Sequence, residues 1–259
     1  MPNRRRRKLD QTVATVQQRY GPQALRRGIG GVNDRSSPHI ATGFAELDAR
    51  TGCGGVPRGA LTLLTGPTTS GKLTLAYKVL AGAQEKSMAT VALIDLARHT
   101  DPDYLQRCGI DLNRLLLIRP DAYTDLGALL LDLTREQRIH AVLLDSLVEA
   151  ALDRTRWRQL LQTLGPAAHH LRRNQGALLC IDDLNPPWLR WLNLDRTAAV
   201  RQHAALHLRF RRERWLRQAG ELIGYRAQVQ IVRSRWRRDQ PTARIEIHFN
   251  GAVRARENW

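Results

Sequence analysis

Short apolar runs alternate with stretches of helical periodicity through the middle of the chain. The runs have the length of strands buried on both faces and lie at Leu61–Thr65, Thr90–Asp95, Leu115–Ile118, Ala141–Asp145 and Ala177–Asp182. Between them, residues 102–108, 124–138 and 155–174 repeat apolar positions at helical spacing. This alternation predicts an α/β fold with a mostly parallel, twisted sheet that helices cover on both faces.

The period changes after residue 204. Ala205–Phe210, Ala227–Val232 and Arg244–Phe249 alternate polar and apolar residues, as half-exposed strands do. Because little helical pattern separates these three segments, we expect an antiparallel extension at one edge of the sheet.

An amphipathic helix is predicted ahead of this core. Leu9, Val13, Val16 and Tyr20 share one helical face, and Gly21-Pro22 ends the helix. Residues 28–39 form a flexible connection, so the helix packs either on its own domain or on a neighbouring subunit. We divide the chain into residues 1–39, with a basic tail, an oligomerisation helix and a linker, and a P-loop core at 40–259.

A phosphate-binding loop is predicted between the strand Leu61–Thr65 and the helix that follows. Gly66–Lys72 matches G-x-x-x-x-G-K, and this strand, loop and helix order directs the loop N–H groups and the helix N-terminus at one point. The alternative is a chance glycine turn. The candidate nucleotide-binding residues are Gly66, Pro67, Thr68, Thr69, Ser70, Gly71, Lys72, Leu73 and Thr74. Leu73 stands where a Ser or Thr hydroxyl would bind Mg²⁺, which puts nucleotide turnover in question.

Acidic residues follow three of the predicted strands. Asp145 ends an apolar run and is a candidate Mg²⁺ ligand of Walker B type, although a strand-end Asp also caps turns. Asp95 ends another run, but residues 96–99 offer no carboxylate to activate water. Asp182 and Asp183 could bind metal or start the turn into a Pro-rich loop, and we favour the turn.

The charge is unevenly distributed over the 259 residues, which carry a net +17. Residues 151–259 hold 21 Lys and Arg against 9 Asp and Glu, whereas residues 41–150 are nearly neutral. Arginine binds phosphate well, although a coding bias towards Arg on a solvated surface is an alternative. Three scattered Cys and the lack of a signal peptide or a long apolar run predict a soluble, intracellular, cytoplasmic protein with no membrane contact.

The order and spacing of several motifs resemble the core of a RecA-type recombinase. The likeness starts near Leu9 and runs to about Gly251, so it covers most of the chain. It rests on residues 40–48 (IATGFAELD), 54–59 (GGVPRG), 66–72 (GPTTSGK), 94–95 (ID), 101–104 (DPDY), 109–112 (GIDL) and 143–146 (LLDS).

The resemblance implies ATP binding with Mg²⁺, filament-like assembly and binding to single-stranded DNA. By position, Asp101 and Tyr104 would contact the adenine, with Tyr104 stacking on it, and Phe249 would lie near the base. Arg233 and Arg235 would act across the interface between subunits.

The departures from the family pattern lie where hydrolysis takes place. Leu73 replaces the Mg²⁺-binding threonine, Ala97 replaces the glutamate that activates water, and Asp183 replaces the glutamine that senses the γ-phosphate. The loss of the threonine hydroxyl at Leu73 predicts a weakened Mg²⁺ site. Loss of a general base typically costs about 10² to 10⁴ in rate, so the two losses together predict almost no turnover. The pattern is similar to ImuA-like RecA relatives, which are accessory proteins of damage-tolerant DNA synthesis.

Arginine flanks most of the tryptophans, all six of which follow residue 156. Arginine for phosphates and indole faces for bases suit single-strand binding, although several of these tryptophans could be core or interface residues. Trp188, Arg190 and Trp191 are the strongest candidates, because the resemblance places the second DNA-binding loop there.

The sequence thus predicts a nucleotide-binding and DNA-binding protein of DNA repair, recombination or damage tolerance, such as the SOS response, with weak or no ATP hydrolysis. Its expected partners are single-stranded DNA and either further copies of itself or a related recombinase. The alternatives are an active DNA-dependent ATPase or recombinase, and a protein-interaction scaffold with a relic P-loop.

Overall fold

The structure is a computed structural model that describes residues 37–85, 89–183 and 198–249, together with residues 11, 12, 15, 18 and 19. The chain divides into two units, Met1–Asn33 and Asp34–Trp259. The five described positions of the first unit are helical. Leu9, Val13, Val16 and Tyr20 lie outside the described residues, so the oligomerisation helix and the domain boundary at residue 39 stay predictions.

The second unit alternates strands and helices as the sequence predicts. Its strands are β1 (His39–Ile40), β2 (Val56–Pro57), β3 (Ala60–Gly66), β4 (Thr90–Ile94), β5 (Leu115–Ile118), β6 (Ile139–Leu144), β7 (Ala177–Asp183), β8 (Ala204–Gln218), β9 (Glu221–Ser234) and β10 (Thr242–His248). Its helices are α2 (Ala45–Thr51), α3 (Lys72–Gln84), α4 (Pro102–Arg107), η1 (Leu112–Arg114), α5 (Leu126–Arg135), α6 (Leu147–Leu152), α7 (Arg154–Asn174) and α9 (Ala198–His203).

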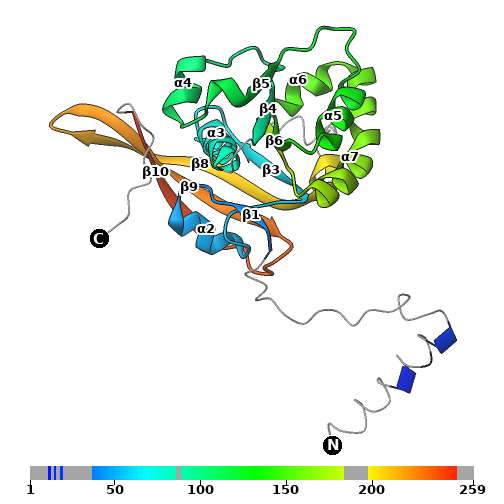
Figure 1. Cartoon of the computed structure of the whole chain (residues 1–259). Helices are drawn as coiled ribbons and strands as arrows, with labels where there is room; N and C mark the ends of the chain where they lie inside the picture. Colours follow the sequence, from blue (N-terminus) through cyan, green and yellow to red (C-terminus); the bar gives the residue numbers. More distant parts are fainter. Residues whose placement is uncertain are drawn as a thin grey trace, which may run out of the picture. The chain divides into compact units, whose positions relative to one another are not determined.

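Eight of the described strands form one sheet in the order β10-β9-β8-β3-β7-β6-β4-β5. All pairs from β8 to β5 are parallel, and β9 and β10 add antiparallel strands at the far edge. In Figure 1, α3 lies against one face of this sheet, and α5, α6 and α7 lie together over another part of it. The predicted α/β fold with an antiparallel edge extension is therefore confirmed.

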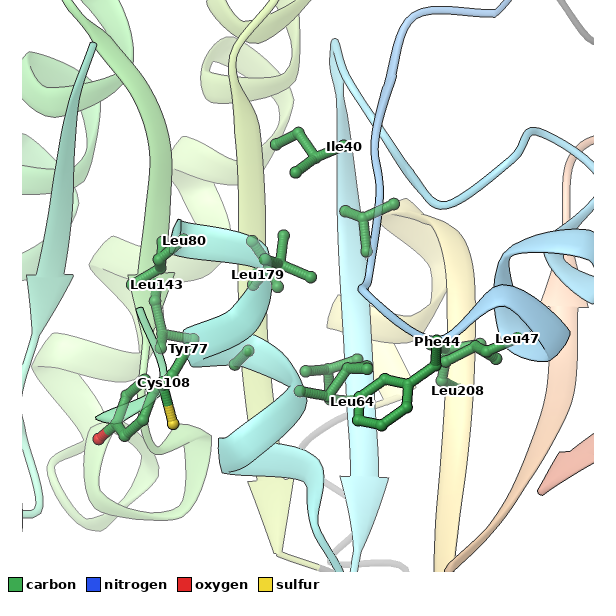
Figure 2. Packing of buried hydrophobic residues seen from close by; sticks show 14 of the residues in the cluster. Ile40, Phe44, Leu47, Leu64, Tyr77, Leu80, Cys108, Leu143, Leu179 and Leu208 are labelled. Atoms are coloured by element: carbon green, nitrogen blue, oxygen red, sulfur yellow. The ribbon is translucent and has the colours of Figure 1, made fainter. Parts of the chain in front are cut away.

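Successive residues of the central strands face two separate cores. On β3, Leu64 joins α3 and α2 in one core, whereas Leu61 and Leu63 join α5, α6 and α7 in the other. Figure 2 shows the first core, where Tyr77 and Leu80 of α3 pack close to the sheet. This alternation follows from the strand period of two, and burial on both faces explains why the central strands are continuous apolar runs.

The edge strands differ from the prediction in length and direction. β8 runs parallel to β3 rather than antiparallel, and only β9 and β10 reverse direction. β8 spans 15 residues and β9 spans 14, because both continue past their buried halves into an exposed hairpin that closes at Ala219-Gly220. The exposed half of β8 carries arginines in place of apolar residues, so hydrophobic alternation does not reveal it.

Candidate functional site

The P-loop connects the carboxyl end of β3 to the first turn of α3. Gly71 has a φ of 95°, and a Cβ added there would lie 2.6 Å from Ile247 Cδ1. A Cβ on Gly66 would lie 2.7 Å from the Phe210 carbonyl oxygen of β8. The Ser70 side chain is buried, and its hydroxyl has no hydrogen-bond partner among the described residues. A loop that only glycine can form, with an unpartnered inward hydroxyl, fits an anionic phosphate.

Lys72 occupies the position of the phosphate-binding lysine at the start of α3. Its ammonium group donates to the Pro67 carbonyl oxygen at 3.0 Å and lies 2.5 Å from Asp183 Oδ1. Asp183 ends β7, and the strand register places it beside Gly66. The Lys72 side chain is 5% exposed and that of Asp183 is 44% exposed. A carboxylate thus takes the contact that a phosphate oxygen would make.

The metal-binding positions do not gather oxygen ligands. Leu73 is half-buried and packs against the core beside α3. The two carboxylate oxygens of Asp145 accept hydrogen bonds from the Leu96 and Ala97 backbone N–H groups, at 2.9 and 3.3 Å. The described residues contain no group of three or more His, Cys, Asp or Glu side chains placed to hold a metal ion. Mg²⁺ at nucleotide sites is usually bound by one or two protein oxygens together with phosphates and waters. Of the two positions predicted for it, Leu73 offers no oxygen, and both carboxylate oxygens of Asp145 already accept backbone hydrogen bonds.

Asp145 and Asp95 form a hydrogen-bonded carboxyl pair at the ends of β6 and β4. Burial is the main reason that the pKa of Asp145 is raised, and the neighbouring charge of Asp95 raises it further. Burial is also the largest single effect on Asp95 and raises its pKa, but the ion pair with Arg119, at 2.8 Å, and hydrogen bonds from Thr100 and Asp145 together hold that pKa below its ordinary value. Of the two carboxyl groups, Asp145 is therefore the one that takes up a proton more readily, and Asp95 is the one that stays ionised more readily.

Tyr104 reaches the P-loop helix from α4. Its hydroxyl lies 2.6 Å from Thr74 Oγ1, and its ring meets Tyr77 edge to face, with the ring centroids 6.0 Å apart. Burial raises the pKa of the Tyr104 hydroxyl, so it remains a neutral hydrogen-bonding group. Asp101 caps α4 by accepting from the Asp103 backbone N–H at 3.0 Å, which ties it to its own helix.

Phe249 lies in an aromatic cluster that we call the edge cluster: Trp215, Tyr225 and Phe249. The three ring centroids are 5.9 to 6.4 Å apart, and Trp215 and Phe249 are each nearly half exposed. The Tyr225 hydroxyl lies 3.2 Å from a Cβ built on Gly71, so the cluster adjoins the P-loop. The structure therefore brings Tyr104 and Phe249 to the same end of α3, and their predicted contacts with the adenine remain a prediction.

Arg233 and Arg235 lie at the other end of β9 from the hairpin turn. In the strand register Arg233 lies opposite His207 of β8, which in turn lies beside Leu63 of β3. The Arg235 backbone N–H donates to the Ala205 carbonyl oxygen at 2.9 Å. Both arginines are thus displaced along the sheet from Gly66, where their own P-loop begins. Trp188, Arg190 and Trp191 lie outside the described residues, so the predicted DNA contact remains a prediction.

Three contacts at the P-loop were not predicted from the sequence. These are the Lys72–Asp183 ion pair, the edge-cluster members Trp215 and Tyr225, and Arg212, whose Nη1 donates to Thr69 Oγ1 at 3.2 Å. The Lys72–Asp183 pair, the approach of Tyr225 to Gly71 and the Arg212–Thr69 hydrogen bond each join residues more than a hundred positions apart along the chain. The arginine-rich pattern after Phe210 was the available signal, but it did not indicate which arginine faces the loop.

Comparison with known proteins supports one family. The family model described as "RecA N-terminal domain" matches residues 7–156, more than half of the chain. Protein RecA of Acholeplasma laidlawii is 26% identical over 267 residues, which cover 97% of this chain and 80% of that protein. Protein RecA of a Roseiflexus species is 27% identical over 258 residues and covers 93% of this chain and 72% of its own length.

The solved structures show the same fold. The crystal structure of the RadB recombinase superposes with a TM-score of 0.60 and 22% identity, covering 80% of this chain and 96% of that one. None of the helices in the described ranges has the length and hydrophobicity needed to cross a membrane. From the family match, together with the strand, loop and helix geometry at Gly66–Lys72, the chain belongs to the RecA-type recombinase superfamily.

Proposed function

We propose that this chain is a DNA repair and recombination protein that binds ATP at its P-loop with little or no hydrolysis and binds DNA through its basic second half. The observation that carries the proposal is an intact phosphate loop beside positions that offer neither metal ligand nor base. Lys72 and the glycines are retained, whereas Leu73 and Ala97 contribute only carbon side chains. The narrower placement among ImuA-like accessory proteins belongs to this proposal.

The geometry around Asp145 supports weak turnover. Activation of water needs a carboxylate near the γ-phosphate, and Ala97 provides none. Its backbone N–H instead donates to Asp145, the carboxyl group that would otherwise bind the metal ion. When bound, Mg²⁺ would supply charge stabilisation at the phosphates. Leu73 offers it no oxygen and Asp145 is engaged with the backbone, which supports a weakened site.

Assembly and DNA binding complete the proposal. Arg233 and Arg235 are displaced from their own P-loop, and both belong to the last third of the chain, where positive charge concentrates. This position supports contact with the nucleotide of a neighbouring subunit, either a second copy or a related recombinase. Arg190 and the two tryptophans beside it are the proposed contact to single-stranded DNA.

A gain-of-function variant tests the proposal. Lys72→Ala should abolish ATP binding, because the loop then loses its buried cation. Leu73→Thr combined with Ala97→Glu should raise ATP turnover above the wild-type rate, since it restores a metal ligand and a base. Turnover in the wild type at the rate of an active recombinase would refute the proposal and favour the DNA-dependent ATPase. Absence of ATP binding in the wild type would favour the scaffold.

A further inference from the structure

Arg212 brings a second cation to the P-loop from the edge of the sheet. It lies on β8 two residues after Phe210, whose carbonyl oxygen approaches Gly66. Its Nη1 donates to Thr69 Oγ1 at 3.2 Å, so the guanidinium group lies at the exposed side of the phosphate loop. Thr69 itself is exposed and has a φ of 61°, which turns the loop outward at this position.

Two local features hold the guanidinium group in place. A register shift in the β8–β9 ladder falls between Arg212 and Arg214, and it puts Arg212 and Trp215 on the same face despite their odd spacing. The guanidinium carbon of Arg212 lies 4.3 Å from the Trp215 ring centroid, which is a cation–π contact. Trp215 is in turn supported by Tyr225 and Phe249.

The charges around the loop leave Arg212 available to an anion. Lys72 is paired with Asp183, whereas Arg212 forms no ion pair with any carboxylate in the described ranges. Arginine presents several N–H donors in a planar fork, and one donor on Thr69 leaves others for phosphate oxygens. Charge-assisted hydrogen bonds of this kind are roughly twice as strong as neutral ones.

We infer that Arg212 binds the phosphate chain of the nucleotide held by its own P-loop, and that it supplies the positive charge that Mg²⁺ supplies in a site with metal ligands. This inference rests on the proposed nucleotide binding and deepens it. Its consequence is that ATP binds this chain without a divalent cation. A P-loop that has Leu73 at one metal-binding position and an Asp145 carboxyl engaged with the backbone can then still bind ATP. The positive charge of Arg212 offsets the negative charge of the phosphates in place of the metal ion.

The test measures the affinity of a fluorescent ATP analogue in two buffers, one with Mg²⁺ and one with EDTA. The wild type should bind with nearly the same affinity in both. Arg212→Gln should weaken binding about tenfold or more in EDTA, which corresponds to the loss of one charge-assisted contact. Trp215→Leu should weaken it by a smaller factor, because the guanidinium group remains but loses the ring that orients it.

Arg211→Gln is the matched control. Arg211 precedes Arg212 on β8, is also exposed, and faces the opposite side of the sheet, so its loss removes the same charge without touching the loop. Thermal unfolding of each variant without nucleotide checks that the fold is intact. Equal losses in both arginine variants would show a general charge effect and overturn the inference.

Two further results would also overturn it. If the wild type binds ATP only in Mg²⁺, or if Arg212→Gln binds as the wild type does, Arg212 is not the phosphate ligand, while the proposed nucleotide binding still holds. If the wild type binds no nucleotide in either buffer, the proposed nucleotide binding itself fails and the inference fails with it.

Discussion

Replacing Asp183 with Asn should raise the affinity for ATP. In the absence of nucleotide, the Asp183 carboxylate holds the Lys72 ammonium group at 2.5 Å, so a phosphate must displace it. Exposed ion pairs contribute about 0.2 to 1 kcal/mol, and removing one partner of a buried pair costs about 3 to 5 kcal/mol. With Lys72 buried and Asp183 nearly half exposed, we expect roughly 1 to 2 kcal/mol, which is about tenfold in affinity.

The same free energy should appear in the stability of the free protein. Asp183→Asn leaves the buried Lys72 charge without its partner, so the midpoint of thermal unfolding without nucleotide should fall, and saturating ATP should restore more stability than in the wild type. Isothermal titration calorimetry measures the affinity for ATP, and differential scanning calorimetry measures the midpoint of thermal unfolding. Asp132→Asn, which removes an exposed pair with Arg135 on α5, is the control and should leave both values unchanged. Unchanged or weaker ATP binding by Asp183→Asn would refute the competition argument.

Three other perturbations probe stability, DNA binding and assembly. Burial and nearby arginines lower the pKa of His207 from 6.5 to about 4, so about 3 kcal/mol of stability should be present above pH 6.5 and lost as the pH falls towards 4. His207→Gln should flatten this dependence in pH-resolved chemical denaturation, and an unchanged slope would contradict it. Trp188→Ala with Trp191→Ala should weaken single-stranded DNA binding at constant salt slope, as anisotropy titrations would show; wild-type affinity would exclude stacking there. Deleting residues 1–30 should lower the number of subunits per particle, measured by light scattering, without unfolding the core. A protein that is a monomer both before and after the deletion would exclude the oligomerisation helix.

The sequence predicted the central fold because the relevant signals are local. A strand buried on both faces must be apolar throughout, and the P-loop needs glycine at Gly66 and Gly71 for close approach to β8 and β10. The apolar runs and the glycine spacing can both be recognised within short stretches of sequence, although the strands that the glycines approach lie far along the chain. The family resemblance, not the local pattern, singled out Tyr104 and Phe249; both lie at the end of α3 beside the loop, and their contact with the adenine stays a prediction.

The contacts that modify the site could not be predicted because they depend on strand order and register. Asp183 meets Lys72 only because β7 lies beside β3 with these two strand ends level. From the sequence we favoured a turn-starting role for Asp183, and nothing nearby in the chain indicated an ion pair. Arg212 and Arg211 are equivalent in the sequence pattern, and only the pairing of β8 with β3 and β9 distinguishes their faces.

Nucleotide binding without useful hydrolysis is tested by measuring binding and turnover in the same sample. Bound ATP and released phosphate are quantified together for the wild-type chain at saturating ATP, with and without single-stranded DNA. We expect about one ATP bound per P-loop, lost in Lys72→Ala, with turnover at least about 10²-fold below that of an active recombinase and unchanged by DNA. DNA-stimulated release of phosphate at an active recombinase's rate would show that the P-loop hydrolyses ATP and would contradict the proposed function.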